Sequence, residues 1–212
     1  MRDIVKGREP VTLVRHRNDA AVAPTYENLP GRAMEALRRQ LLADQGALCC
    51  YCTRRITLDT SRIEHWAPRA KHPTRALDGR NLLLACDGHA ADGPDAHTCD
   101  VLKDDSELSL DPLDGVEHRL RYDAEGRILA DTDHRQSELD RVLGLNRPHV
   151  VRRRRAALDG MMEALAKRRT GAWPRRLIED KLGWCRAKVR DEFPAFAPLL
   201  VYWLERRLDR QR

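Results

Sequence analysis

Four cysteines limit the folds open to this chain: Cys49 and Cys52, which two residues separate, and Cys86 and Cys99 further along. Two thiolates with the first spacing, C-x-x-C, can reach one zinc ion from a single tight turn. Taken alone, such a pair is also typical of a redox site, and a polar Gly/Asp/Ala loop separates Cys86 from Cys99. The two additional cysteines nevertheless favour a closed four-thiolate site for structural zinc, with Cys50 pointing away from the metal.

Length and composition agree with metal ligands rather than disulfides. The chain has 212 residues, of which 42% are hydrophobic, enough for the core of one ordinary domain or of two small ones. We find no uncharged apolar run of about 18 residues and no apolar N-terminal stretch typical of a secretory signal. We therefore expect a cytoplasmic protein without membrane contact, where reducing conditions keep its cysteines as thiols.

The segment between the cysteines is predicted to form a strand, a loop, a second strand and a short helix. Residues 62–66 have the pattern of a strand, residues 68–79 that of a polar loop, and residues 81–85 that of an apolar strand. Thr98 can then cap the N-terminus of a short helix. Such a hairpin is too small to be stabilised by its own core, so the zinc would join its entrance to its exit.

Side chains suited to phosphodiester hydrolysis lie inside this segment. His65 can take a proton from water, while Glu64 and Asp100 can hold a catalytic Mg²⁺ or Mn²⁺. We expect Asn81 to orient the His65 ring by a hydrogen bond and Lys103 to contact phosphate. Glu64 and His65 can serve one site only if the strand is irregular, because neighbouring strand residues point to opposite faces. This ββα-metal arrangement predicts an endonuclease that cleaves nucleic acid, DNA more readily than RNA.

An alternative interpretation remains open. A Glu-His pair is common on protein surfaces, Asn81 could be an ordinary turn residue, and Asp100 could simply complement a helix N-terminus. Each residue alone favours these ordinary roles, whereas their joint order between the cysteines favours catalysis. The alternative is a non-catalytic zinc-knuckle module that binds nucleic acid or a protein, with Glu64 and His65 incidental.

The flanking regions are predicted to be mostly helical. Residues 10–14 have the pattern of a short strand or an extended arm, and apolar residues recur at helical spacing over residues 31–45. A hairpin is predicted over residues 117–130. Three amphipathic helices are predicted to begin near Pro148, Pro174 and Pro198.

These expectations divide the chain into three parts. Residues 1–46 would form an N-terminal arm and an amphipathic helix, and residues 47–133 the zinc-clasped ββα-metal module with its following hairpin. Residues 134–212 would form a basic C-terminal helical bundle, which packs on the central module or on a second copy of the chain. The predicted fold class is therefore α+β.

Basic charge is concentrated at the C-terminal end. Residues 145–212 hold 18 Lys and Arg against 8 Asp and Glu, a net charge of +10, whereas residues 1–144 carry −4. The net charge of +6 makes polyanions plausible partners. We predict that Arg152, Arg153 and Arg155 bind nucleic acid. Arg155 lies on the apolar side of its helix, so it needs either a phosphate or a carboxylate of the acidic segment after the motif.

Several motifs also resemble one known family. They are Leu48-Cys49-Cys50-Tyr51-Cys52-Thr53-Arg54-Arg55-Ile56, Ile63-Glu64-His65-Trp66-Ala67-Pro68, Asn81-Leu82-Leu83 with Cys86, Cys99-Asp100 with Lys103, and less specifically residues 108–112 and 142–146. In these motifs the chain is similar to the HNH endonucleases of Septu-type and retron-associated antiviral defence systems, the PtuB-like proteins, over residues 1 to about 155. The resemblance implies a nuclease subunit that works with an ABC/SMC-like ATPase in antiphage defence.

Overall fold

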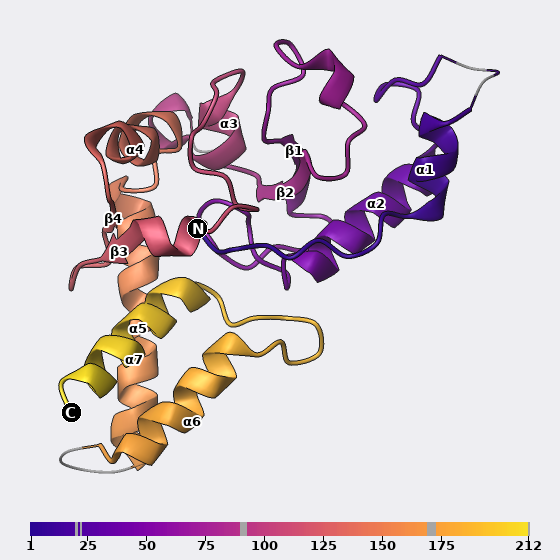
Figure 1. Ribbon diagram of the computed structural model, residues 1–212. Helices are drawn as coiled ribbons and strands as arrows, with labels where there is room; N and C mark the ends of the chain where they lie inside the picture. The colour runs from indigo at the N-terminus through magenta and orange to yellow at the C-terminus, as the bar shows by residue number, and fades with distance from the viewer. Residues whose placement is uncertain (20, 22, 90–92, 169–172, 212) are drawn as a thin grey trace.

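A two-stranded antiparallel sheet occupies the centre of the first half of the computed structural model, which describes residues 1–19, 21, 23–89, 93–168 and 173–211. Its strands are β1 (Ser61–His65) and β2 (Leu82–Cys86), and the short helix α3 (Cys99–Lys103) packs against β2. The predicted order of strand, loop, strand and helix is confirmed, with each strand displaced by one residue. The fold is accordingly a mixed one with small sheets (Figure 1).

Strand β2 is apolar along its whole length because both its faces are covered. All five of its residues are buried, and helix α2 (Gly31–Asp44) packs beside it. Directly after α2, Gln45 replaces a third strand at the free edge: Leu84 N donates to Gln45 Oε1 at 2.7 Å, and Gln45 Nε2 donates to Leu84 O at 2.8 Å. Gln45 thus supplies the acceptor for Leu84 N and a second donor for Leu84 O, which also accepts a hydrogen bond from Cys50 N at 3.0 Å.

The N-terminal region departs from one expectation. The predicted amphipathic helix is confirmed as α2, with Leu37 and Leu41 buried. Residues 10–14, however, are not a strand or an extended arm, because α1 (Val11–Arg17) follows Pro10 as a helix. Leu13 is the buried residue of α1, which packs on α2, so this tertiary contact outweighs the β-branched composition of the segment.

A second hairpin and a short helix complete the first half. Strands β3 (Leu120–Tyr122) and β4 (Ile128–Ala130) pair antiparallel, as predicted. Helix α4 (Asp133–Ser137) begins at Thr132, whose hydroxyl accepts a hydrogen bond from Arg135 N, and a π-helical turn over Glu138–Val142 continues it.

The C-terminal region is a three-helix bundle, as predicted. It consists of α5 (Pro148–Arg168), α6 (Arg175–Arg186) and α7 (Ala197–Asp209), and it has a hydrophobic core of its own. Figure 1 shows α5 running from the central module down to the other two helices. Val150 near its start belongs to the core of the first half, and Leu158 belongs to the second core. In the described part of the chain, no helix combines the length and the apolar character needed to cross a membrane.

Candidate metal and catalytic site

The four cysteines named from the sequence form one buried cluster. Their sulfur atoms all lie within 4.8 Å of one another, with 3.9 Å between Cys49 and Cys99 and 3.8 Å between Cys52 and Cys86. A tetrahedral zinc with Zn–S bonds of about 2.3 Å needs sulfur atoms about 3.8 Å apart. This four-cysteine site can therefore hold a metal ion such as zinc. As expected, Cys50 is buried but is not one of the clustered residues.

Two arginines supply charge that fits such a centre. Four thiolates and one Zn²⁺ carry a net charge of −2. Arg154 of α5 is only 2% exposed, and its Nε and Nη1 have no hydrogen-bond partner among the described residues. Burial lowers the pKa of Arg154, and Cys52 and Cys99 are among the groups that oppose this effect. Burial also disfavours the charge of Arg54, but nearby groups, led by the Cys86 thiol, outweigh it and raise its pKa. The sequence did not indicate either role: that of Arg154 depends on how α5 packs, and that of Arg54 on how the chain folds after Cys52.

A cavity of about 670 Å³ opens beside the four-cysteine site, and we call it the Glu64–His65 cavity. Glu64, His65 and Asp100 all line it. Strand β1 ends at His65, and the chain turns away directly afterwards. Arg62 and Ile63 line the cavity as well, so consecutive residues of β1 reach it although residues of a regular strand point alternately to opposite faces.

Glu64 is held in a network of buried polar groups. Its side chain is 3% exposed, and its Oε1 accepts hydrogen bonds from Tyr51 Oη at 2.6 Å and from Lys103 Nζ at 2.8 Å. Burial and the neighbouring Asp100 carboxyl raise the pKa of Glu64 to about 8. Asp100 in turn pairs with Arg62, whose Nε lies 3.2 Å from its Oδ2. Two carboxyl groups this close repel each other when both are charged, and a divalent cation between them removes that repulsion.

His65 is a neutral imidazole whose orientation is fixed by a backbone contact. Burial lowers the pKa of His65 to about 4, so the ring is neutral at pH 7. Its Nε2 lies 3.0 Å from the carbonyl oxygen of Ala76. Because a carbonyl only accepts hydrogen bonds, Nε2 carries the proton and Nδ1 carries the free lone pair. Tyr26 packs edge-on against the ring, with 4.7 Å between the ring centroids.

The structure corrects the expectation for Asn81. No hydrogen bond among the described residues joins its side chain to the His65 ring. Instead Asn81 Oδ1 accepts from Ala67 N at 2.7 Å, and Nδ2 donates to the carbonyl oxygens of Ala67 and Arg75 at 3.0 and 3.1 Å. Asn81 thus fixes the loop that follows His65, and the Ala76 carbonyl of this loop holds the ring.

Lys103 is also placed differently from the prediction. Its side chain is 1% exposed, and its Nζ donates to the carbonyl oxygen of His65 at 3.1 Å in addition to contacting Glu64. A buried ammonium group keeps its charge only with such partners. Lys103 therefore compensates the charge of Glu64 when that carboxyl is ionised, and its buried position prevents direct contact with a phosphate in the cavity.

The predicted nucleic-acid residues lie on α5. Arg152 and Arg153 are exposed, and Arg153 Nη1 lies 3.2 Å from His89 Nε2. Arg155 does not lie on the apolar side, because it is exposed and pairs with Asp159 one turn further along, at 2.9 Å. Its anionic partner therefore comes from its own helix rather than from the acidic segment. Arg154 is the arginine of this run that is buried.

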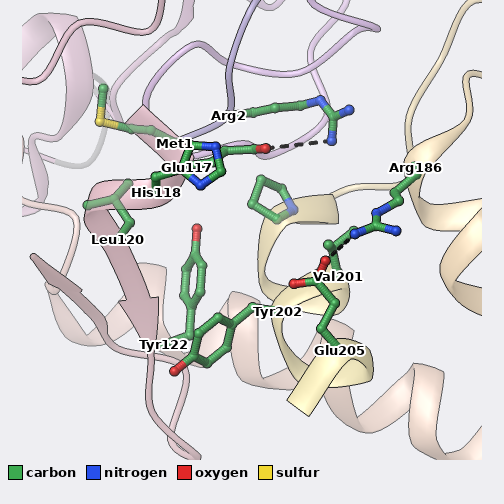
Figure 2. Close-up of a pocket in the computed structure, with 11 residues that line it drawn as sticks. Met1, Arg2, Glu117, His118, Leu120, Tyr122, Arg186, Val201, Tyr202 and Glu205 are labelled. Atoms are coloured by element: carbon green, nitrogen blue, oxygen red, sulfur yellow. Dashed lines mark hydrogen bonds and ion pairs between the residues drawn. The ribbon is translucent and has the colours of Figure 1, made fainter. Parts of the chain in front are cut away.

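A separate cavity of about 420 Å³ lies where the N-terminus and β3 meet α7. Figure 2 shows Tyr122 and Tyr202 on one side and two charged pairs, Arg2 with Glu117 and Arg186 with Glu205, at its border. None of the predicted metal ligands or catalytic residues lines this cavity. Glu64, His65 and Asp100 line the Glu64–His65 cavity instead.

The described chain combines a buried four-cysteine cluster that could hold a metal ion with a ββα unit whose Glu64, His65 and Asp100 line one cavity, which defines a mixed α/β module with a candidate metal site. No family model matches the chain. Over 175 residues, which cover 71% of this chain and 83% of the other, it is 22% identical to a protein of Vibrio cholerae serotype O1 biovar El Tor. That protein is named as the candidate HNH endonuclease of retron Vc95. The similarity is distant, and it supports assignment to HNH endonucleases in general.

Proposed function

We propose that this protein is a metal-dependent HNH endonuclease that hydrolyses phosphodiester bonds of nucleic acid. The observation that carries the proposal is the geometry of His65. Its ring is neutral, its Nε2 is occupied by a backbone carbonyl, and it lines the same cavity as two carboxyl groups that can bind a cation. The distant similarity to an HNH endonuclease supports the same conclusion.

The chain's own residues would act as follows. His65 Nδ1 takes a proton from a water molecule, and the water oxygen forms a bond to phosphorus while the bond from phosphorus to the leaving sugar oxygen breaks. Glu64 and Asp100 would hold the divalent cation, which neutralises charge on the phosphate and on the leaving oxygen when bound. Asn81 and the Ala76 carbonyl keep the His65 ring in the orientation that puts its proton on Nε2 and leaves Nδ1 as the basic nitrogen.

The finer parts of the proposal concern substrate and setting. We expect DNA rather than RNA as the preferred substrate and Mg²⁺ or Mn²⁺ as the catalytic ion, with Zn²⁺ in the four-cysteine site. The motifs shared with Septu-type and retron-associated nucleases favour a cytoplasmic effector of antiphage defence, and the relative's name refers to a retron. An ABC/SMC-like ATPase is the partner that this setting would supply.

Cleavage assays with one variant test the proposal. Purified protein is incubated with plasmid DNA and with a mixed RNA pool, in Mg²⁺, in Mn²⁺ and without a divalent cation. Loss of a general base costs about 10²- to 10⁴-fold in rate, and we expect this loss for His65→Ala. His118→Ala is the matched control, because His118 is exposed and lies outside the cavity. Equal cleavage by the wild type and His65→Ala would contradict the proposal and favour the non-catalytic zinc-knuckle alternative.

A further inference from the structure

Tyr51 connects the two metal sites of this protein. It lies inside the C-x-x-C turn, between Cys50 and Cys52, and its side chain is 0% exposed. Its hydroxyl donates to Glu64 Oε1 at 2.6 Å. A hydroxyl of a turn residue thus reaches a carboxylate on β1, 13 positions along the chain.

Lys103 approaches the same oxygen from the other side of the hairpin. Its Nζ lies 2.8 Å from Glu64 Oε1, and it ends helix α3, whose first residue is Cys99. Both donors therefore come from elements that also carry cysteines of the four-cysteine site. Two donors occupy Oε1, and the Glu64 carboxyl is also hydrogen-bonded to Asp100. A cation between Glu64 and Asp100 would replace that bond and use the second oxygen of Glu64.

We propose that Tyr51 is a positioning residue that orients Glu64 for the divalent cation, so that the turn holding the structural metal also sets the affinity of the catalytic one. The identity of that cation rests on the proposed function. The geometry of the hydrogen bond between Tyr51 and Glu64 is independent of that function, and the experiment measures cation binding directly. The hydroxyl acts by fixing which oxygen of Glu64 faces the cavity, and it touches neither substrate nor cation.

The central experiment compares Tyr51→Phe with the wild type, both as full-length, zinc-loaded protein. Mn²⁺ affinity is measured by electron paramagnetic resonance without nucleic acid, and zinc content is measured in the same samples. Loss of a hydrogen bond to a metal ligand typically weakens metal affinity by about 10- to 100-fold, and we expect this loss for Mn²⁺ with zinc content unchanged. Tyr122→Phe is the control, because Tyr122 is half-buried and its hydroxyl takes no part in the Glu64 network.

A double-mutant cycle separates positioning from general stability. Glu64→Asp keeps a carboxylate but moves it away from Tyr51 by one methylene group, so Mn²⁺ binding weakens yet remains measurable. If Tyr51 acts through Glu64, adding Tyr51→Phe to Glu64→Asp changes the Mn²⁺ affinity by less than about twofold. A purely structural role would instead give the full additional loss in both backgrounds.

Unchanged Mn²⁺ affinity in a zinc-loaded Tyr51→Phe protein would overturn the proposal, whatever the cleavage assays show. If that variant fails to hold zinc, the proposal is tested instead by fluorine NMR of wild-type protein labelled with 3-fluorotyrosine. The chain has four tyrosines, so the Tyr51 resonance can be assigned by substituting the other three. We expect it to shift during a Mg²⁺ titration with the same midpoint as cation binding, and a constant resonance would overturn the proposal.

Discussion

Burial acts in opposite directions on the two neighbouring residues of the cavity. It disfavours the charged form of either group, so it raises the pKa of Glu64 to about 8 and lowers that of His65 to about 4. His65 is therefore unprotonated throughout the neutral range. Glu64 is largely protonated at pH 7 as long as no cation is bound, and a cation has to displace this proton.

The cation affinity should consequently depend on pH. The charged form of Glu64 binds the cation, so binding strengthens as the pH rises toward about 8 and becomes constant above it. Between pH 6 and pH 7 we expect about one proton to be released for each Mn²⁺ bound, and the dissociation constant to fall about tenfold per pH unit, with the release declining to about half a proton near pH 8. Calorimetry in buffers of different ionisation enthalpy measures this proton release.

Glu64→Gln provides the control for this prediction. Its amide cannot titrate, so the variant should bind Mn²⁺ weakly and with no pH dependence in this range. His65 should not contribute, because its pKa lies below the range studied. A Mn²⁺ affinity of the wild type that stays constant from pH 6 to pH 8 would contradict the assignment of Glu64 as a ligand.

At the residue level, the sequence indicated which side chains meet but not how they bond. Glu64, His65 and Asp100 were chosen for their chemistry, and all three line one cavity. Asn81 and Lys103 were also expected near it, but their hydrogen bonds go to Ala67 and to Glu64. An amide or an ammonium group can bond any peptide or carboxylate in reach, so their partners depend on the path of the loop, which the sequence does not specify.

At the level of elements, the four-cysteine site joins three pieces of the chain. Cys49 and Cys52 precede β1, Cys86 ends β2, and Cys99 begins α3. A two-stranded sheet is at best marginally stable alone. A metal bound by all four cysteines adds its binding free energy to the stability of the whole ββα unit.

Removal of one metal ligand should therefore unfold the central module. Structural zinc in small zinc-binding peptides contributes about 10–16 kcal/mol, more than the total stability of an ordinary domain. For Cys52→Ser and Cys86→Ser we expect loss of bound zinc together with loss of cooperative thermal unfolding of the first half. Metal analysis and calorimetry of purified protein check both.

Cys50→Ser is the matched control, since Cys50 is buried beside the ligands but does not belong to the cluster. It should keep its zinc and lose no more than about 1–3 kcal/mol, the cost of burying a hydroxyl. A Cys86→Ser protein that is free of zinc and still folds cooperatively would refute the structural role of the site.

Helix α2 and strand β2 could be predicted from the pattern of their apolar residues, whereas α1 could not. Helix α2 carries its own apolar stripe, with Ala33, Leu37 and Leu41 buried, and β2 is a continuous apolar run. Helix α1 has a single buried side chain, Leu13, and β-branched residues that favour extended structure. Its helical state depends on packing against α2, a contact that no local pattern indicates.

At the scale of the whole molecule, α5 joins the central module to the C-terminal bundle. Val150 packs in the first core and Leu165 in the second, while Arg154 between them is buried near the four-cysteine site. The sequence showed that four arginines surround this helix. It could not show which of them is buried, because that depends on the angle at which α5 crosses the module.

The exposed arginines Arg152, Arg153 and Arg155 of α5 should differ from one another in their effect on nucleic-acid binding. Arg152 and Arg153 are exposed, and no ion pair among the described residues uses either of them. Each lost phosphate contact reduces the slope of log K against log salt concentration by about 0.7 for single strands and about 0.9 for duplex DNA. We therefore expect the double variant Arg152→Gln/Arg153→Gln to bind more weakly and to lose about 1–2 units of slope. Fluorescence anisotropy at several salt concentrations measures both.

Arg155→Gln is the control, because the sequence predicts that Arg155 binds nucleic acid whereas the structure shows it already paired. Sequence analysis grouped Arg155 with the other two, but its guanidinium is already paired with Asp159 and also donates to the carbonyl oxygen of Ala124. A phosphate would have to replace these contacts, so the exchange offers little net gain. We expect Arg155→Gln to leave the salt slope unchanged. An equal loss of slope in the single variants of Arg152, Arg153 and Arg155 would instead mean that the pair between Arg155 and Asp159 opens and that all three exposed arginines bind phosphate. An unchanged slope in the Arg152/Arg153 double variant would place the nucleic-acid contacts elsewhere on the molecule.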